Sequence, residues 1–248
     1  MVADALAYRG KIGIVVPSSN TTVQPECEAL RPPGVTNHTG RVTIKERPLT
    51  SEQAFLEHVQ MMRDGLGGAI DQLMTARPDH LIMGVALEAF WGGAEGAAAL
   101  QANLSECAGV GVSMGSTAAA AALRAFGARR IAVLTPHQPR GDEQVARFFQ
   151  DSGFNLVRLK GLACASPAMI PQVSAETMRD AFHELDGEDV EALVQVGTGM
   201  IAMDVAAALE RALGKPVLSI NAVTYWDALR RLGIEDRVPG HGRILEEH

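Results

Sequence analysis

Four short segments, each placed directly after an apolar run, carry the side chains that are best suited to chemistry. Pro17-Ser18-Ser19-Asn20-Thr21-Thr22 supplies hydroxyl and amide groups ahead of an expected helix, an arrangement that binds anions. The segment from Gly84 to Gly93 contains Glu88, a candidate general base if burial raises its pKa. His137 follows a third apolar run and can donate to an anion or transfer a proton. Gly197-Thr198-Gly199 follows the fourth, and its backbone can approach a ligand closely.

Each of these segments also has an ordinary structural interpretation. The Ser, Asn and Thr run is equally typical of a helix-capping loop. Glu88 fits a solvated loop or the exposed start of a helix, and His137 fits a solvated loop. Gly199 is compatible with a simple tight turn. The position of the four segments after expected strands favours the functional interpretation, because open parallel sheets bind ligands beyond the carboxyl ends of their strands.

The motifs of common cofactors are absent from the sequence. It has neither G-x-G-x-x-G nor a P-loop, so we expect no nucleotide cofactor. The three cysteines lack metal-site or disulfide spacing, and the other histidines are scattered along the chain. We therefore expect neither a metal nor a nucleotide cofactor. These residues are Cys27, Cys107 and Cys164, with His38, His58, His80, His183, His241 and His248.

Short apolar runs alternate with helical patterns along the chain, which predicts parallel sheets joined by helical crossovers. The expected strands are Ile12–Val16, Arg41–Ile44, His80–Met83, Gly111–Met114, Ile131–Leu134, Asn155–Arg158, Ala192–Val196 and Val217–Ile220. The expected helices include Ser51–Ala76, Gly96–Ala108, Ser116–Phe126, Asp142–Ser152, Ser174–Leu185 and Met203–Leu213, with Asn221 capping a last helix through Leu232.

The two halves of the chain repeat one another. Lys11–Pro17 is similar to Arg130–Pro136, 119 positions later. Ser113, Ala122, Leu123, Arg124 and Gly127 match Ser219, Ala228, Leu229, Arg230 and Gly233 at an offset of 106. The repeat predicts two pseudo-symmetric α/β lobes, residues 1–115 plus 222–248 and residues 116–221, with the active cleft between them.

Composition narrows the class of protein. With 47% hydrophobic and 4% aromatic residues, the core is aliphatic, as in enzymes built on parallel sheets. A net charge of −7 argues against nucleic acid and anionic membranes as partners. No apolar run is long enough to span a bilayer, and residues 1–10 lack a signal-peptide core. We therefore expect a cytoplasmic protein.

Several of these motifs, in order along nearly the whole chain, resemble the Asp/Glu racemase superfamily, in its branch of maleate cis-trans isomerases and arylmalonate decarboxylases. Val16–Val23 resembles the isomerase signature, and Val238–Arg243 resembles the decarboxylase end of the branch. Gly214-Lys215-Pro216-Val217 and Trp226-Asp227-Ala228 also fit the family pattern. The resemblance implies two lobes, each with a four-stranded parallel sheet flanked by helices, and a small anionic substrate bound between them without a cofactor.

The resemblance also assigns site residues. Family members carry catalytic cysteines at the ends of two strands, and here those positions fall on Gly84 and Gly197. The binding residues correspond to Ser18, Ser19 and Asn20 on one side, with Val85, Ala86, Thr198 and Gly199 on the other. His137 falls where the family usually has a tyrosine donor.

We therefore expect a cysteine-free enzyme that acts on a small carboxylate, a dicarboxylate or a related cyclic amide. Its acid–base work would fall to His137, Glu88 or a water held by Thr198. The loss of the sulfur nucleophile favours lyase, decarboxylase or hydrolase chemistry over isomerisation of a double bond. Two alternatives stay open: a non-catalytic carboxylate-binding protein, and a maleate isomerase that uses a displaced cysteine such as Cys164. Because members of the resembled family are often dimers or tetramers, the resemblance also implies that this protein is a homo-oligomer.

Overall fold

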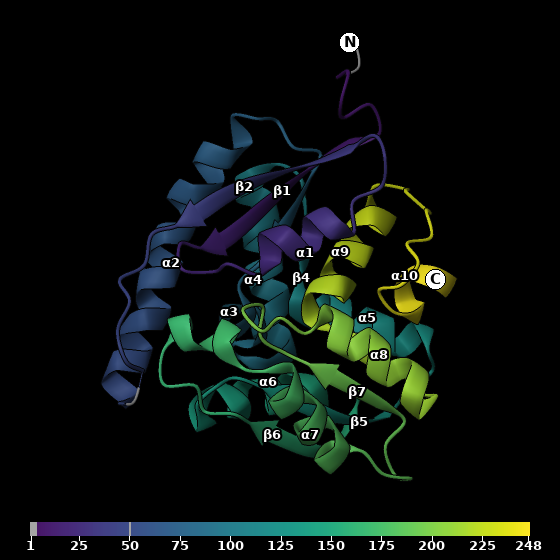
Figure 1. Cartoon of the computed structure of the whole chain (residues 1–248). Helices are drawn as coiled ribbons and strands as arrows, with labels where there is room; N and C mark the ends of the chain where they lie inside the picture. The colour runs from purple at the N-terminus through teal and green to yellow at the C-terminus, as the bar shows by residue number, and fades with distance from the viewer. Residues whose placement is uncertain (1–3, 50) are drawn as a thin grey trace.

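The computed structural model describes residues 4–49 and 51–248 and contains two four-stranded parallel sheets, one from each half of the chain (Figure 1). The strand order is β2-β1-β3-β4 in the first sheet and β6-β5-β7-β8 in the second. The first sheet contains β1 (Gly10–Pro17), β2 (Val35–Val42), β3 (His80–Met83) and β4 (Gly111–Met114). The second contains β5 (Arg130–Thr135), β6 (Asn155–Gly161), β7 (Ala192–Gln195) and β8 (Val217–Ser219). The predicted fold class is confirmed.

The internal repeat appears as the same order of strands in both sheets. Each sheet ends in a strand that leads directly into a helix, α5 (Gly115–Ala125) after β4 and α9 (Ile220–Arg231) after β8. Gly127 and Gly233, which match in the sequence repeat, follow these helices with φ of 68° and 70°. A positive φ there suits glycine, so the repeat preserves the same helix stop twice. The exact lobe boundaries stay a prediction.

Helices surround both sheets (Figure 1). Around the first sheet, α2 packs against β1 and β2, and α4 packs against β4. Helix α9, from the second half of the chain, packs against β3 and β4 of the same sheet. In the second half, α7 packs against β5 and β6, and α8 against β8. The remaining bounds are α1 (Val23–Ala29), α2 (Glu52–Met74), α3 (Ala86–Phe90), α4 (Gly93–Ala108), α6 (Pro139–Asp151), the 3₁₀ helix η1 (Pro167–Gln172), α7 (Ala175–Leu185), α8 (Met203–Leu213) and α10 (Arg243–Glu247).

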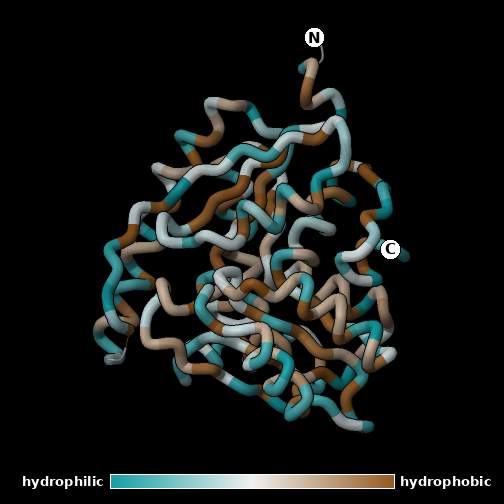
Figure 2. Tube along the Cα trace, in the orientation of Figure 1, coloured by the Kyte–Doolittle hydropathy of each residue, from teal (hydrophilic) through white to brown (hydrophobic). Residues whose placement is uncertain are grey.

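The strands are buried on both faces, which explains their continuous apolar runs. All four residues of β3 and of β7 are buried, and Figure 2 shows hydrophobic strands inside a more polar outer layer. The largest hydrophobic cluster takes residues from both sheets, including Ile14 of β1 and Val133 of β5. The lobes therefore share one core. Among the described residues, no helix is long and apolar enough to cross a membrane.

Two expectations about the elements were wrong. The second strand is Val35–Val42, not Arg41–Ile44. It is the edge strand beside β1, and its central residues are only partly buried, so polar side chains are tolerated there. Asn221 does not cap the last helix, because α9 begins one residue earlier, at Ile220, and Asn221 is buried in its first turn. Ser174 caps α7, since its side chain accepts from the Thr177 N–H.

Candidate functional site

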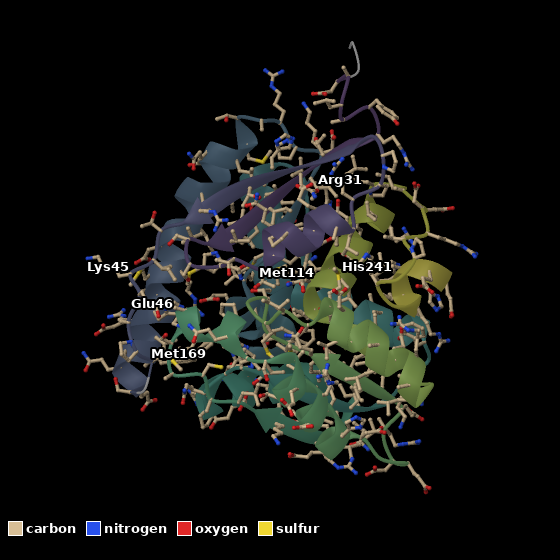
Figure 3. The ribbon with its side chains drawn as sticks, viewed as in Figure 1. Arg31, Lys45, Glu46, Met114, Met169 and His241 are labelled. Carbon is tan, nitrogen blue, oxygen red and sulfur yellow. The ribbon has the colours of Figure 1, made fainter. Side chains whose placement is uncertain are left out.

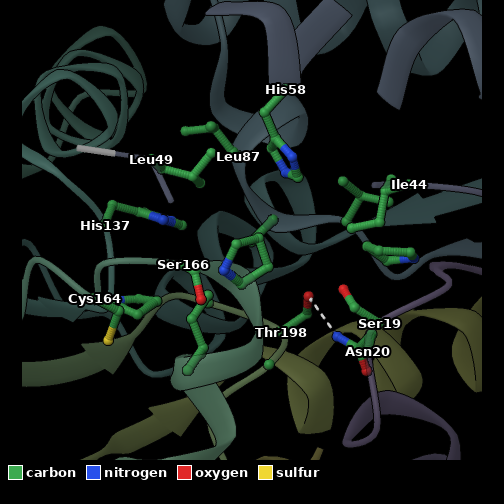
Figure 4. A pocket seen from close by; sticks show the side chains of 18 of the residues that line it. Ser19, Asn20, Ile44, Leu49, His58, Leu87, His137, Cys164, Ser166 and Thr198 are labelled. Carbon is green, nitrogen blue, oxygen red and sulfur yellow. Dashed lines mark hydrogen bonds between the residues drawn. The ribbon is translucent and has the colours of Figure 1, made fainter. Parts of the chain in front are cut away.

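A pocket lies between the lobes, beyond the carboxyl ends of β1, β3, β5 and β7 (Figure 4). Nine of the eleven residues predicted for the site line it. Ser19, Asn20, Val85, Ala86 and Glu88 come from the first half of the chain, and His137, Gly197, Thr198 and Gly199 from the second. The structure thus brings together segments that are far apart in sequence, as the repeat and the strand-end rule predict.

The other two predicted residues, Ser18 and Gly84, do not line the pocket. The Ser18 hydroxyl accepts the Ile44 backbone N–H at 3.1 Å and so holds the chain that follows β2. The Gly84 N–H donates to Val15 O at 2.7 Å, so this amide is not free for a carboxylate. Both groups are used to build the walls of the pocket rather than to face it.

Thr198 joins the two lobes at the pocket. Its hydroxyl donates to Gly84 O at 3.1 Å and accepts a long contact of 3.4 Å from Asn20 Nδ2 (Figure 4). Asn20 is fixed in turn, because its Oδ1 accepts the N–H groups of Thr22 and Val23 at the start of α1. Within residues 4–49 and 51–248, the amides of Thr198 and Gly199 have no hydrogen-bond acceptor, so both are free for a ligand.

Glu88 is buried in α3 with only 3% of its surface exposed, which excludes the solvated alternative. Its Oε1 is buried and has no hydrogen-bond partner among the described residues. Burial raises the pKa of Glu88 to about 7. A carboxyl group with this pKa can both give and take a proton at neutral pH.

His137 follows β5, and its Nε2 is buried without a partner in the described part of the chain. Burial lowers the pKa of His137 to about 4, so its imidazole is neutral at pH 7. A neutral imidazole has one nitrogen that donates and one that accepts. Figure 4 shows the ring directed into the pocket, so it can exchange a proton with a bound molecule.

His58, which the sequence analysis set aside, also lines the pocket. It extends from α2 toward the same space as His137 (Figure 4), and its buried Nδ1 has no partner in the described residues. Burial lowers its pKa, with a smaller contribution from Arg47. A signal was present in the sequence: His58 is three residues after Phe55 and four before Met62, both buried on the inner face of the helix.

The remaining wall is mainly apolar and comes from both halves of the chain. Ile44 and Leu49 belong to the segment after β2, and Ile170 belongs to η1. The Leu49 N–H donates to Ala165 O at 2.8 Å, and the Ala168 N–H donates to Glu46 Oε1 at 3.3 Å. Figure 3 shows Glu46 beside Met169, where these two segments meet. The two segments together form one wall of the pocket.

Cys164 supplies the one thiol at the pocket wall among the described residues. Burial raises the pKa of this thiol, which disfavours the nucleophilic thiolate. In Figure 4 its sulfur is directed away from Thr198. Cys27 is buried in α1, and Cys107 is exposed on α4. Across residues 4–49 and 51–248, no three His, Cys, Asp or Glu side chains are placed to hold a metal ion.

Two four-stranded parallel sheets in the same strand order, with a pocket of polar and apolar side chains between them, define a two-lobed α/β protein with an interlobe site. The chain belongs to the arylmalonate decarboxylase family, whose sequence profile matches residues 12–245.

Curated relatives include both kinds of enzyme in this branch. A maleate isomerase from Nocardia farcinica is 27% identical over 245 residues, which is 96% of each chain. The arylmalonate decarboxylase of Bordetella bronchiseptica is 31% identical over 171 residues, 67% of this chain and 70% of the relative. A mutant of the Nocardia farcinica maleate cis-trans isomerase, solved with a covalently bound succinylcysteine intermediate, has a TM-score of 0.88 and 26% identity, covering 96% of this chain and 99% of that one.

Proposed function

We propose that this protein is a cofactor-independent enzyme that acts on a small carboxylate, a dicarboxylate or a related cyclic amide. The observation that carries the proposal is that three buried titratable atoms without partners in residues 4–49 and 51–248 belong to residues of one interlobe pocket: Glu88 Oε1, His137 Nε2 and His58 Nδ1. Buried polar groups are normally satisfied within a protein. Unsatisfied ones that converge on a pocket are suited to a ligand and to proton transfer.

The reaction class that fits this site is a lyase, decarboxylase or hydrolase reaction. The relatives are named as isomerases and decarboxylases, and one of them is described with a covalent intermediate on cysteine. Here the two family positions of the cysteines correspond to Gly84 and Gly197, so the acid–base steps pass to Glu88 and His137. The free amides of Thr198 and Gly199 bind the substrate carboxylate, and Thr198 fixes their position between the lobes.

The atoms around Gly84 and Gly197 leave little space for a side chain at either position. A Cβ atom on Gly84 would lie 2.7 Å from Val16 Cγ1. A Cβ on Gly197 would lie 2.4 Å from Pro136 Cδ, and the residue has a φ of +126°. Neither position has room for a cysteine unless its neighbours move, and the φ of Gly197 disfavours any side chain.

The test is to incubate the protein in D₂O with maleate, malonates, α-amino dicarboxylates and cyclic imides, and to follow each by proton NMR. Deuterium uptake, loss of CO₂ or ring opening would establish catalysis and identify its class. Binding to a member of the panel without turnover would instead support the alternative of a carboxylate-binding protein.

For the substrate that reacts, Glu88→Gln and His137→Gln should each lower kcat by about 10²–10⁴-fold, the range for a lost general acid or base. Glu95→Gln and His183→Gln are matched controls, because both residues are exposed on helices. Full activity of both site variants would reject these roles.

A second candidate is a maleate isomerase that uses Cys164, and the observation that favours it is the place of this thiol in the pocket wall. Maleate in the same panel would then yield fumarate, and Cys164→Ala would abolish the conversion. Cys107→Ala is the control, since that thiol is exposed on α4. Conversion of maleate by Cys164→Ala would exclude this mechanism.

A further inference from the structure

Glu26 of α1 is a buried carboxyl group whose contacts reach into the second half of the chain. Its Oε2 accepts from Asn221 Nδ2 at 2.6 Å, and its Oε1 accepts the Met203 backbone N–H at 3.3 Å. Met203 is the first residue of α8, so the carboxylate of one lobe satisfies the N-terminus of a helix in the other. Glu26 does not line the pocket, and the acid–base roles proposed above do not use it.

Asn221 connects Glu26 to the binding loop. Its Nδ2 also donates to Thr198 O at 3.1 Å. An amide nitrogen carries two hydrogens, and Glu26 and Thr198 O use both. The same loop is held from α1 by a second bond, in which the Thr22 hydroxyl donates to Gly199 O at 2.9 Å.

The orientation of the Asn221 amide depends on the charge state of Glu26. An ionised carboxylate only accepts hydrogen bonds, so it requires Asn221 to present its NH₂ group, and the second hydrogen then faces Thr198 O. A protonated Glu26 carries a hydroxyl that donates, which allows the amide to turn over. In that orientation Asn221 Oδ1 faces the Thr198 carbonyl, and the loop loses its donor.

We propose that ionised Glu26 is a positioning residue, which holds the Thr198–Gly199 loop in its binding geometry through Asn221 and through the N-terminus of α8. The proposal rests on the proposed function in taking this loop as the part of the site that binds the substrate carboxylate.

The surroundings of Glu26 set the pH range of this effect. Burial raises the pKa of Glu26 to about 7, against the opposing effect of its hydrogen bonds from Asn221 and Met203. Asp204 on α8 adds to the rise, and the α9 group that contacts Glu26 is the uncharged amide of Asn221. Neighbouring Cys27 stays a neutral thiol, because burial raises its pKa.

Loop anchoring and overall stability should therefore respond to pH with opposite signs. As the pH rises through about 7, Glu26 ionises and the loop becomes better anchored. The same ionisation lowers overall stability, because the pKa of Glu26 in the folded protein lies above its ordinary value of 4.5. The stability contributed by this group is complete below pH 4.5 and is lost as the pH rises to about 7. A purely structural role would make both quantities follow the same trend.

Amide hydrogen–deuterium exchange of the ligand-free protein tests the proposal. We expect protection of the peptide that covers residues 197–203, corrected for intrinsic exchange, to rise about tenfold between pH 5.5 and pH 8.5, the scale of one charge-assisted hydrogen bond. In Glu26→Gln this protection should be low and independent of pH. The control is Glu28→Gln on the same helix, an exposed position that should behave like the wild type.

Asn221→Ser provides a second variant if Glu26→Gln does not fold, because it breaks the link while leaving the carboxylate in place. It should also abolish the pH dependence of loop protection. The proposal is overturned if both variants keep the wild-type profile, or if loop protection in the wild type simply follows global stability. No substrate is used, so failure of the NMR panel would leave this result unaffected.

Discussion

At the scale of single residues, the pocket contains the titratable side chains of Glu88 and His137, and burial shifts the pKa of each so that its uncharged form is favoured. Burial raises the pKa of Glu88 to about 7 and lowers that of His137 to about 4. Near pH 6 the carboxyl is mostly protonated and the imidazole is neutral, so a proton donor and a proton acceptor coexist. A cysteine-free decarboxylase or hydrolase needs one acid and one base of this kind.

Glu88 allows a direct test of this electrostatic description through stability. Its pKa of about 7 in the folded protein exceeds the ordinary value of 4.5, so its contribution to stability is complete below pH 4.5 and is lost as the pH rises to about 7. Glu88→Gln removes the buried charge. The variant should therefore gain stability relative to the wild type as the pH rises, by at most about 3 kcal/mol at pH 8.

Urea unfolding of both proteins at pH 5 and pH 8 measures this difference. Glu95→Gln is the control, because Glu95 is exposed and its replacement should have the same small effect at both values. A Glu88→Gln effect that does not change with pH would contradict a desolvated carboxyl group at this site.

At the scale of elements, β3 is followed directly by a glycine, Gly84, whose neighbours leave no room for a side chain. A Cβ on Gly84 would lie 2.7 Å from Val16 Cγ1 and 3.0 Å from Val15 O, both on β1. Gly84→Ala should therefore lower the free energy of unfolding by about 1–3 kcal/mol, the usual cost of overpacking. Gly68→Ala in α2 is the matched control, because nothing lies within 4 Å of its Cβ. It should stabilise the protein by about 0.5–1 kcal/mol.

Thermal unfolding of the two variants compares these positions. A Gly84→Ala protein as stable as the wild type would show that the end of β3 adjusts freely. In that case Gly84 would also have room for a cysteine side chain.

The elements also show how far the sequence alone could be interpreted. Buried strands such as β3 and β4 were predicted with the observed bounds, because a short apolar run that ends at a glycine or a helix start is a local signal. The edge strand β2 was misplaced, since its half-buried surface carries Thr, Asn and His. His58 was missed as a pocket residue because its proximity to His137 depends on how α2 packs across the lobes. The partners of Asn221 were not predictable either, because they depend on how α9 packs against α1 and the loop after β7.

At the scale of the whole molecule, the site exists only because the lobes are joined. Thr198 bonds to Gly84 O, Thr22 bonds to Gly199 O, and Asn221 bonds to Glu26. Beneath these contacts, one hydrophobic cluster includes residues of both sheets, and α5 packs against α9. These contacts hold the two sides of the pocket together, and we expect a ligand to enter without separation of the lobes.

A shared core predicts that the two lobes unfold together. Differential scanning calorimetry should give a single transition whose calorimetric and van't Hoff enthalpies agree. Thr198→Val should shift this transition as a whole, because it leaves Gly84 O and Asn20 Nδ2 buried without their partner, at a cost of about 1–3 kcal/mol. Thr177→Val is a suitable control, since Thr177 is exposed on α7. Two resolved transitions, with only one of them moved by Thr198→Val, would show that the lobes are independent units and that the pocket can open by separating them.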